Sequence, residues 1–75
     1  MNKYVANSWY ELPGKGMVAS VSLHTDELPK VGEMVEVDGK RFAIRGTETD
    51  LVNRESWKGH PVGLLLGKEL NHGAK

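Results

Sequence analysis

Three histidines and one lysine between two glycines are the residues of this 75-residue chain whose types could suit metal or phosphate chemistry. His24, His60 and His72 lack the short spacing of metal-ligand pairs, and the chain has no cysteine to complete a zinc site. Residues 14–16, Gly-Lys-Gly, lack the Ser or Thr and the following helix that a phosphate-binding loop requires. No nucleophile elbow supports a Ser-His-Asp set. We therefore predict no metal, no cofactor and no catalytic residue, and thus no enzyme.

A basic cluster follows, made of Lys40, Arg41 and Arg45 around Phe42. Basic residues interleaved with an aromatic can form a nucleic-acid surface. Neighbouring carboxylates neutralise this cluster, and we expect Phe42 to face inward. A solvated charged face is the preferred interpretation, and a nucleic-acid surface is the alternative.

Large apolar side chains are the candidates for a protein interface: Trp9, Tyr10, Trp57 and Leu65. In a small barrel the aromatics usually cap the ends of the core, whereas an exposed one is a natural interface anchor. Three consecutive leucines at residues 64–66 cannot all face one core. Either this strand is covered on both faces, which we favour, or Leu65 lies in an interface and the chain weakly self-associates.

Composition indicates one small folded domain. Ten basic and ten acidic residues give a formal net charge of zero, which does not favour non-specific nucleic-acid binding and makes a protein the preferred partner. The absence of cysteine agrees with a cytoplasmic location, and no apolar run is long enough to span a membrane. We expect one domain over residues 1–70 and a flexible tail over residues 71–75.

The centre of the chain predicts a β-hairpin. Asp38 and Gly39 suit the two central positions of a type I′ turn, where both residues need positive φ. This turn would place Glu36 opposite Arg41, and Val35 opposite Phe42. The predicted core residues of the hairpin are Val35, Phe42 and Ile44.

Other strands are expected on either side of this hairpin, over residues 4–10, 17–23 and 62–66. In the second of these, Met17 begins the buried face and Val18 the polar face. Turns are expected at residues 12–16 and 57–61, and residues 47–56 form a loop or one helical turn. The fold class is therefore all-β: a small closed or nearly closed antiparallel barrel of about six short strands.

The order of these features resembles the second domain of elongation factor Tu and related translational GTPases, a translation-factor β-barrel. The resemblance covers residues 14–67 and depends, in order, on Gly16, residues 30–33 (Lys-Val-Gly-Glu), Gly46, Glu48, Gly59, Val62 and Gly63. It implies a free-standing barrel that binds RNA or a translation factor. The chain departs from the family at Gly67, where an Arg is usual, and at Leu51, where a basic residue is expected; a GTPase domain is also lacking.

The resemblance also implies a ligand site. The family glutamate that matches Glu48 helps to hold the terminal adenosine of aminoacyl-tRNA, so Glu48, Val62 and Leu64 would border a shallow depression. The alternative is that Glu48 only ends a strand and faces water. Two functions remain open: a non-catalytic module of the translation machinery that contacts tRNA, the ribosome or a factor, or a protein–protein interaction barrel unrelated to translation.

Overall fold

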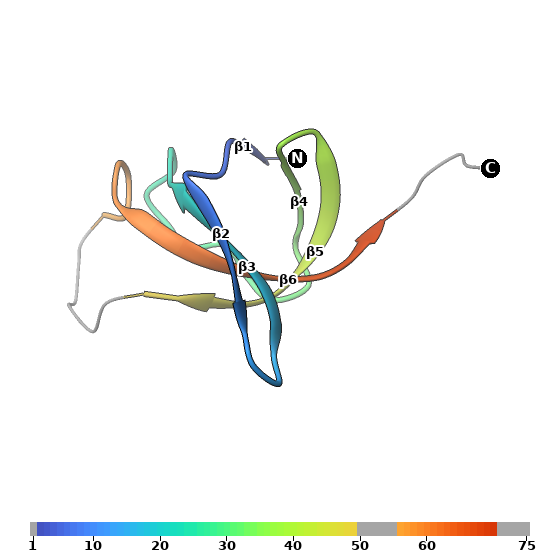
Figure 1. The fold of residues 1–75 in the computed structure, drawn as a ribbon. Coiled ribbons are helices and arrows are strands. Elements are labelled where there is room, and N and C mark those ends of the chain that lie inside the picture. The colour runs from blue at the N-terminus through green and yellow to red at the C-terminus, as the bar shows by residue number, and fades with distance from the viewer. Residues whose placement is uncertain (1, 50–55, 71–75) are drawn as a thin grey trace.

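The computed structural model describes residues 2–49 and 56–70, which form six β-strands in one mixed sheet (Figure 1). The strands are β1 (Asn2–Tyr4), β2 (Ser8–Leu12), β3 (Gly16–Ser22), β4 (Met34–Val37), β5 (Lys40–Glu48) and β6 (Pro61–Leu70). Their order across the sheet is β1-β4-β5-β6-β3-β2, and these two stretches contain no helix. The all-β prediction is therefore confirmed. The expected tail at residues 71–75 and the expected basic position at Leu51 lie outside the described residues.

The central hairpin has the predicted turn and register. Asp38 and Gly39 both have positive φ, 52° and 83°, as a type I′ turn requires. Val35 pairs with Phe42, and Glu36 pairs with Arg41. Strand β6 runs from Pro61 to Leu70 and is thus longer than the predicted strand over residues 62–66.

The two edge strands show where the prediction was wrong. A single strand over residues 4–10 was expected, but residues 5–7 leave β1 and cross to β2 on the opposite edge of the sheet. Strand β1 pairs with β4 in parallel, so the sheet is not wholly antiparallel. No ladder of hydrogen bonds joins β1 to β2 within the described residues. The sheet is therefore not closed by backbone pairing.

Asp38 explains why the first strand divides. Its Oδ1 accepts the backbone N–H of Ala6 (2.9 Å), its Oδ2 accepts the indole Nε1–H of Trp9 (2.9 Å), and its own N–H donates to the Tyr4 carbonyl (3.0 Å). The Asn7 N–H donates to the Ser20 carbonyl (2.7 Å). These bonds hold residues 5–7 over the turn between β4 and β5, so the chain does not continue as one strand.

One apolar core holds the sheet together. It comprises Tyr4, Ala19, Val21, Leu23, Val35, Val37, Phe42, Ile44, Val62, Leu64 and Leu66. The prediction of Val35, Phe42 and Ile44 as core residues is confirmed. Burying each large apolar side chain contributes about 1.5–3 kcal/mol, so this core is the main source of the stability of the fold.

The outer face of the sheet carries a second, smaller cluster, which corrects the prediction for β3. Val18 is 0% exposed although it was expected on the polar face. Val18 pairs with Tyr10 on one side and with Leu65 on the other. Gly63, which has no side chain, leaves room for Val18 to pack closely against β6. Leu65 is half-buried on this face and is thus partly covered within the chain. Self-association through Leu65 stays a prediction.

Candidate functional site

Strands β3 and β6 pair over only half of the length of β6. Their pairing runs from Ser22 and Pro61 to Val18 and Leu65, and β6 then continues to Leu70 beside β5 alone. A bulge lies at this point, because Gly67 and Lys68 of β6 face only Ala43 of β5. In Figure 1 the tip of the β2–β3 hairpin points down while the end of β6 runs to the right. The two strands therefore diverge.

A groove of about 510 Å³ lies where the strands diverge. The residues that line it are Trp9, Met17, Asp38, Lys40, Phe42, Gly67, Lys68 and Glu69. They come from β2 and β3 on one side and from β5, its turn and β6 on the other. Apolar side chains and charges of both signs thus meet in one concave surface, which is the usual composition of a binding site.

Trp9 is the largest side chain of the groove and is held from two directions. Its Nε1–H donates to Asp38 Oδ2, and its ring meets that of Phe42 at a centroid distance of 5.9 Å and a tilt of 56°. The side chain is nevertheless 39% exposed. It is therefore a fixed aromatic surface open to a partner. Of the other aromatics, Tyr10 packs on the outer face and Trp57 packs against the core.

Met17 forms the hairpin side of the groove. It was predicted to be buried but is 45% exposed, because β3 no longer pairs with β6 at this position. Alternation along β3 does place Met17 on the same face as Ala19, so the predicted face was correct. A methionine side chain is flexible and polarizable, and it can adapt to different partners.

The carboxylate of Asp38 links the groove to the fold. The N–H groups of Ala6 and Trp9 and the nearby ammonium of Lys40 hold the pKa of the Asp38 carboxyl below its usual value. Asp38 thus stays ionised and keeps the Trp9 ring in place over the groove. From the sequence, Asp38 was expected to form the turn and to help neutralise the basic cluster, but its bond to Trp9 was not predicted.

The predicted basic cluster is not one surface. Lys40 lines the groove. Side chains of consecutive strand residues point to opposite faces, so Arg41 projects from the other face of β5. Arg45 Nη1–H donates to the backbone carbonyl of Lys15 (3.1 Å), in the turn of the β2–β3 hairpin. The three side chains are therefore divided between two faces, and Arg45 has a structural bond.

The three residues that the resemblance implied as a ligand site also lie apart. Val62 and Leu64 are 1% and 0% exposed in the core. Glu48 is exposed and lies beside Gly63, on the outer face. Because residues 62 and 64 face one side of the sheet and residue 63 the other, these side chains do not border one depression.

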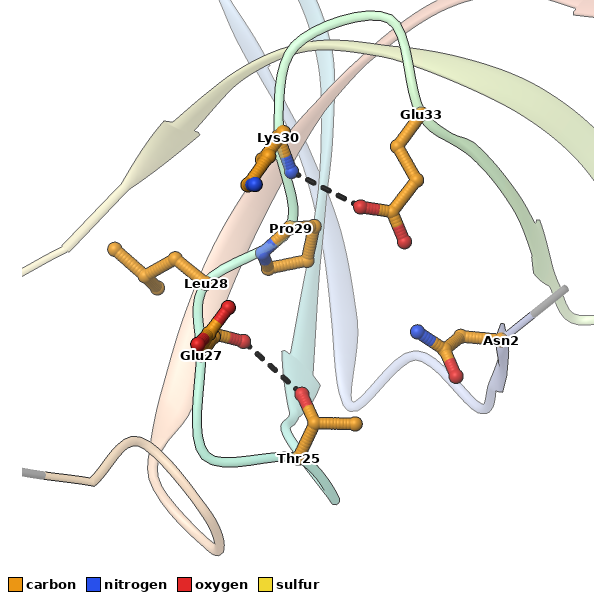
Figure 2. Close-up of a pocket in the computed structure, with 7 residues that line it drawn as sticks. All are labelled: Asn2, Thr25, Glu27, Leu28, Pro29, Lys30 and Glu33. Carbon is orange, nitrogen blue, oxygen red and sulfur yellow. Dashed lines mark hydrogen bonds between the residues drawn. The ribbon is translucent and has the colours of Figure 1, made fainter.

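A second cavity of about 320 Å³ lies under the loop before β4 (Figure 2). Its lining residues are Asn2, Thr25, Glu27, Leu28, Pro29, Lys30 and Glu33. Two of its polar groups bond within the loop: Glu33 Oε1 accepts the Lys30 N–H (3.1 Å), and the Thr25 hydroxyl donates to the Glu27 carbonyl (3.0 Å). These bonds shape the loop itself, so we do not take this cavity as the site.

Tyr4 lies at the edge of the core near this loop. Its hydroxyl is buried and makes no hydrogen bond within the described residues. Burial and the nearby charge of Glu33 raise the pKa of the Tyr4 hydroxyl, because both disfavour the phenolate. The Tyr4 ring stacks on His24 at 4.8 Å. His24 therefore packs on an aromatic ring, and the neighbouring Leu23 N–H donates to the His60 carbonyl (3.1 Å).

Residues 2–49 and 56–70 contain no group of three His, Cys, Asp or Glu side chains placed to hold a metal ion. No helix long and apolar enough to cross a membrane occurs in the same residues. Comparison with protein-family models, with curated proteins and with solved structures gave no match. The function is therefore inferred from the groove between the diverging strands.

Proposed function

We propose that this chain is a non-catalytic binding module that holds an extended segment of a partner protein in the groove. The observation that carries this proposal is the exposed pair Trp9 and Met17, which faces a length of β6 that has lost its neighbour β3. Buried aromatic anchors at the centre of an interface contribute most of its binding energy. Trp9 is already fixed in place, so little side-chain entropy is lost when a partner covers it.

The main chain of β6 supports an extended partner. Leu66, Glu69 and Leu70 pair with β5 on one side, and within the described residues no strand pairs with residues 66–70 on the β3 side. An edge of this kind presents N–H and C=O groups that a peptide can pair with as an added strand. The apolar groove beside this edge would receive alternate side chains of that peptide.

The charges of the groove favour a protein over a nucleic acid. Lys40 lies near Asp38, and Lys68 precedes Glu69, so each cation has an anion close by. A phosphate backbone is instead recognised by an excess of basic groups, which makes the binding strongly salt-dependent. The groove has no such excess.

We also propose that the sheet is a nearly closed barrel like the translation-factor domain that the sequence resembles. Its support is that residues 5–7 alone separate the two edge strands, and that Asp38 bonds to this connection. On this proposal the partner belongs to the translation machinery. A partner unrelated to translation would leave the groove proposal intact and remove only the family assignment.

Site-specific photo-crosslinking tests the proposed function. A benzophenone amino acid replaces Met17 inside the groove or Met34 outside it, two methionines that are 45% and 38% exposed. In an extract of the source cells, we expect a discrete protein adduct from position 17 only, and its loss when Trp9→Ser is added. Equal adducts from both positions, or an adduct to RNA, would contradict the proposal.

A further inference from the structure

Arg45 crosses the outer face of the sheet from β5 to the tip of the β2–β3 hairpin. Its Nη1–H donates to the Lys15 carbonyl at 3.1 Å. Within the described residues, this is the one side-chain hydrogen bond that the hairpin tip, residues 12–17, makes to the rest of the sheet. The backbone pairing between β3 and β6 has already ended at Val18 and Leu65. Arg45 therefore links the tip directly to β5.

Two glycines leave room for this side chain. A Cβ on Gly67 would lie 3.4 Å from Arg45 Cδ and 3.4 Å from the Ala43 carbonyl oxygen. A Cβ on Gly16 would lie 3.7 Å from Arg45 Nη1, and Gly16 also has a φ of 128°, which favours glycine. The arginine thus passes over Gly67, a residue that lines the groove, and reaches the carbonyl two residues before Met17.

We infer that Arg45 is a positioning residue that fixes the width of the groove. It does not line the groove itself, but it bonds to the hairpin that carries Trp9 and Met17. A groove of fixed width is preorganised, and preorganisation improves affinity because less motion must be frozen on binding. This inference rests on the proposed function for its biological role, while the spacing itself can be measured without a partner.

The native absence of cysteine allows a direct measurement of this spacing. Nitroxide labels on Glu11→Cys in β2 and Lys68→Cys in β6 report the distance between the hairpin and β6. We expect Arg45→Ala to broaden the distance distribution and lengthen its mean. Arg45→Lys should restore part of the narrow distribution, because an ammonium can also donate to the Lys15 carbonyl. Arg41→Ala is the matched control, since Arg41 lies on the same strand and outside the groove.

An unchanged distribution in Arg45→Ala, with a wild-type melting temperature, would overturn the inference. So would equal broadening in Arg41→Ala. For a partner identified through Met17, Arg45→Ala should weaken binding about fivefold, which matches the loss of one charged hydrogen bond at a partly solvated site. Broadening without any partner adduct would reject the proposed function alone, and a groove-specific adduct without broadening would reject this inference alone.

Discussion

Gly63 shows how one missing side chain determines the packing of the outer face. A Cβ at this position would lie 2.9 Å from Tyr10 Oη, 2.9 Å from Val18 Cγ1 and 3.1 Å from Glu48 Cβ. The Tyr10 ring can move, but Val18 is fully buried and cannot. Gly63→Ala should therefore destabilise the fold by about 1–3 kcal/mol, the usual cost of overpacking, as measured by urea unfolding.

Gly46→Ala is the matched control for this substitution. Its added Cβ would meet only the Leu65 side chain, at 3.6 Å from Cδ2 and 3.9 Å from Cβ, and both are ordinary van der Waals contacts. We expect its free energy of unfolding to lie within about 0.5 kcal/mol of wild type. Equal destabilisation by both alanines would show that the close packing around Gly63 is not the cause.

Asp38 gives the fold a dependence on pH. Hydrogen bonds from Ala6 and Trp9 lower the pKa of the folded carboxyl, so its stabilising contribution is complete above the unfolded value of about 3.9 and is lost as the pH falls through the folded value. The urea concentration at the unfolding midpoint should decrease as the pH is lowered from about 7 to about 3. Asp38→Asn should make this decrease smaller. Glu11→Gln, which removes an exposed carboxylate, is the control and should leave the decrease of the urea midpoint unchanged.

At the scale of elements, the β4–β5 hairpin depends on its turn. Gly39 has a φ of 83° and open space at its Cβ position, so a substitution there is disfavoured by the backbone and not by contacts. Gly39→Val should cost about 1–2 kcal/mol, while Gly39→Asn, which tolerates positive φ, should cost less. Equilibrium unfolding of both variants checks this. Equal stability of the valine variant and wild type would contradict the turn assignment.

The same hairpin shows which elements could be predicted from sequence. Its turn residues, register and core pairs are neighbours along the chain, so local rules were sufficient. The division between β1 and β2 was not predicted, because the bond from Trp9 to Asp38 joins residues 29 positions apart. The groove was missed for a similar reason: Met17 is exposed only because β6 bulges at Gly67 and leaves β3. Gly67 directly after three leucines was the available signal.

For the molecule as a whole, the curvature of one sheet separates a sealed core from an open groove. Strands β3, β5 and β6 bury their inner faces where they pair, and the groove opens where β3 and β6 stop pairing. Glu48, Val62 and Leu64, which the sequence resemblance implied as a ligand site, are divided between the outer face and the core. The proposed binding groove lies at the opposite end of the paired region of β6.

Trp9 and Tyr10 provide the most direct test, because they are adjacent, similarly exposed at 39% and 42%, and on opposite faces of β2. Titration calorimetry with the partner captured at Met17 would compare Trp9→Ala with Tyr10→Ala, after melts establish that both variants are folded. The account predicts a loss of about 2 kcal/mol or more in binding free energy for Trp9→Ala, and less than about 0.5 kcal/mol for Tyr10→Ala. Equal losses, or a larger loss for Tyr10→Ala, would contradict the assignment of the groove as the binding site.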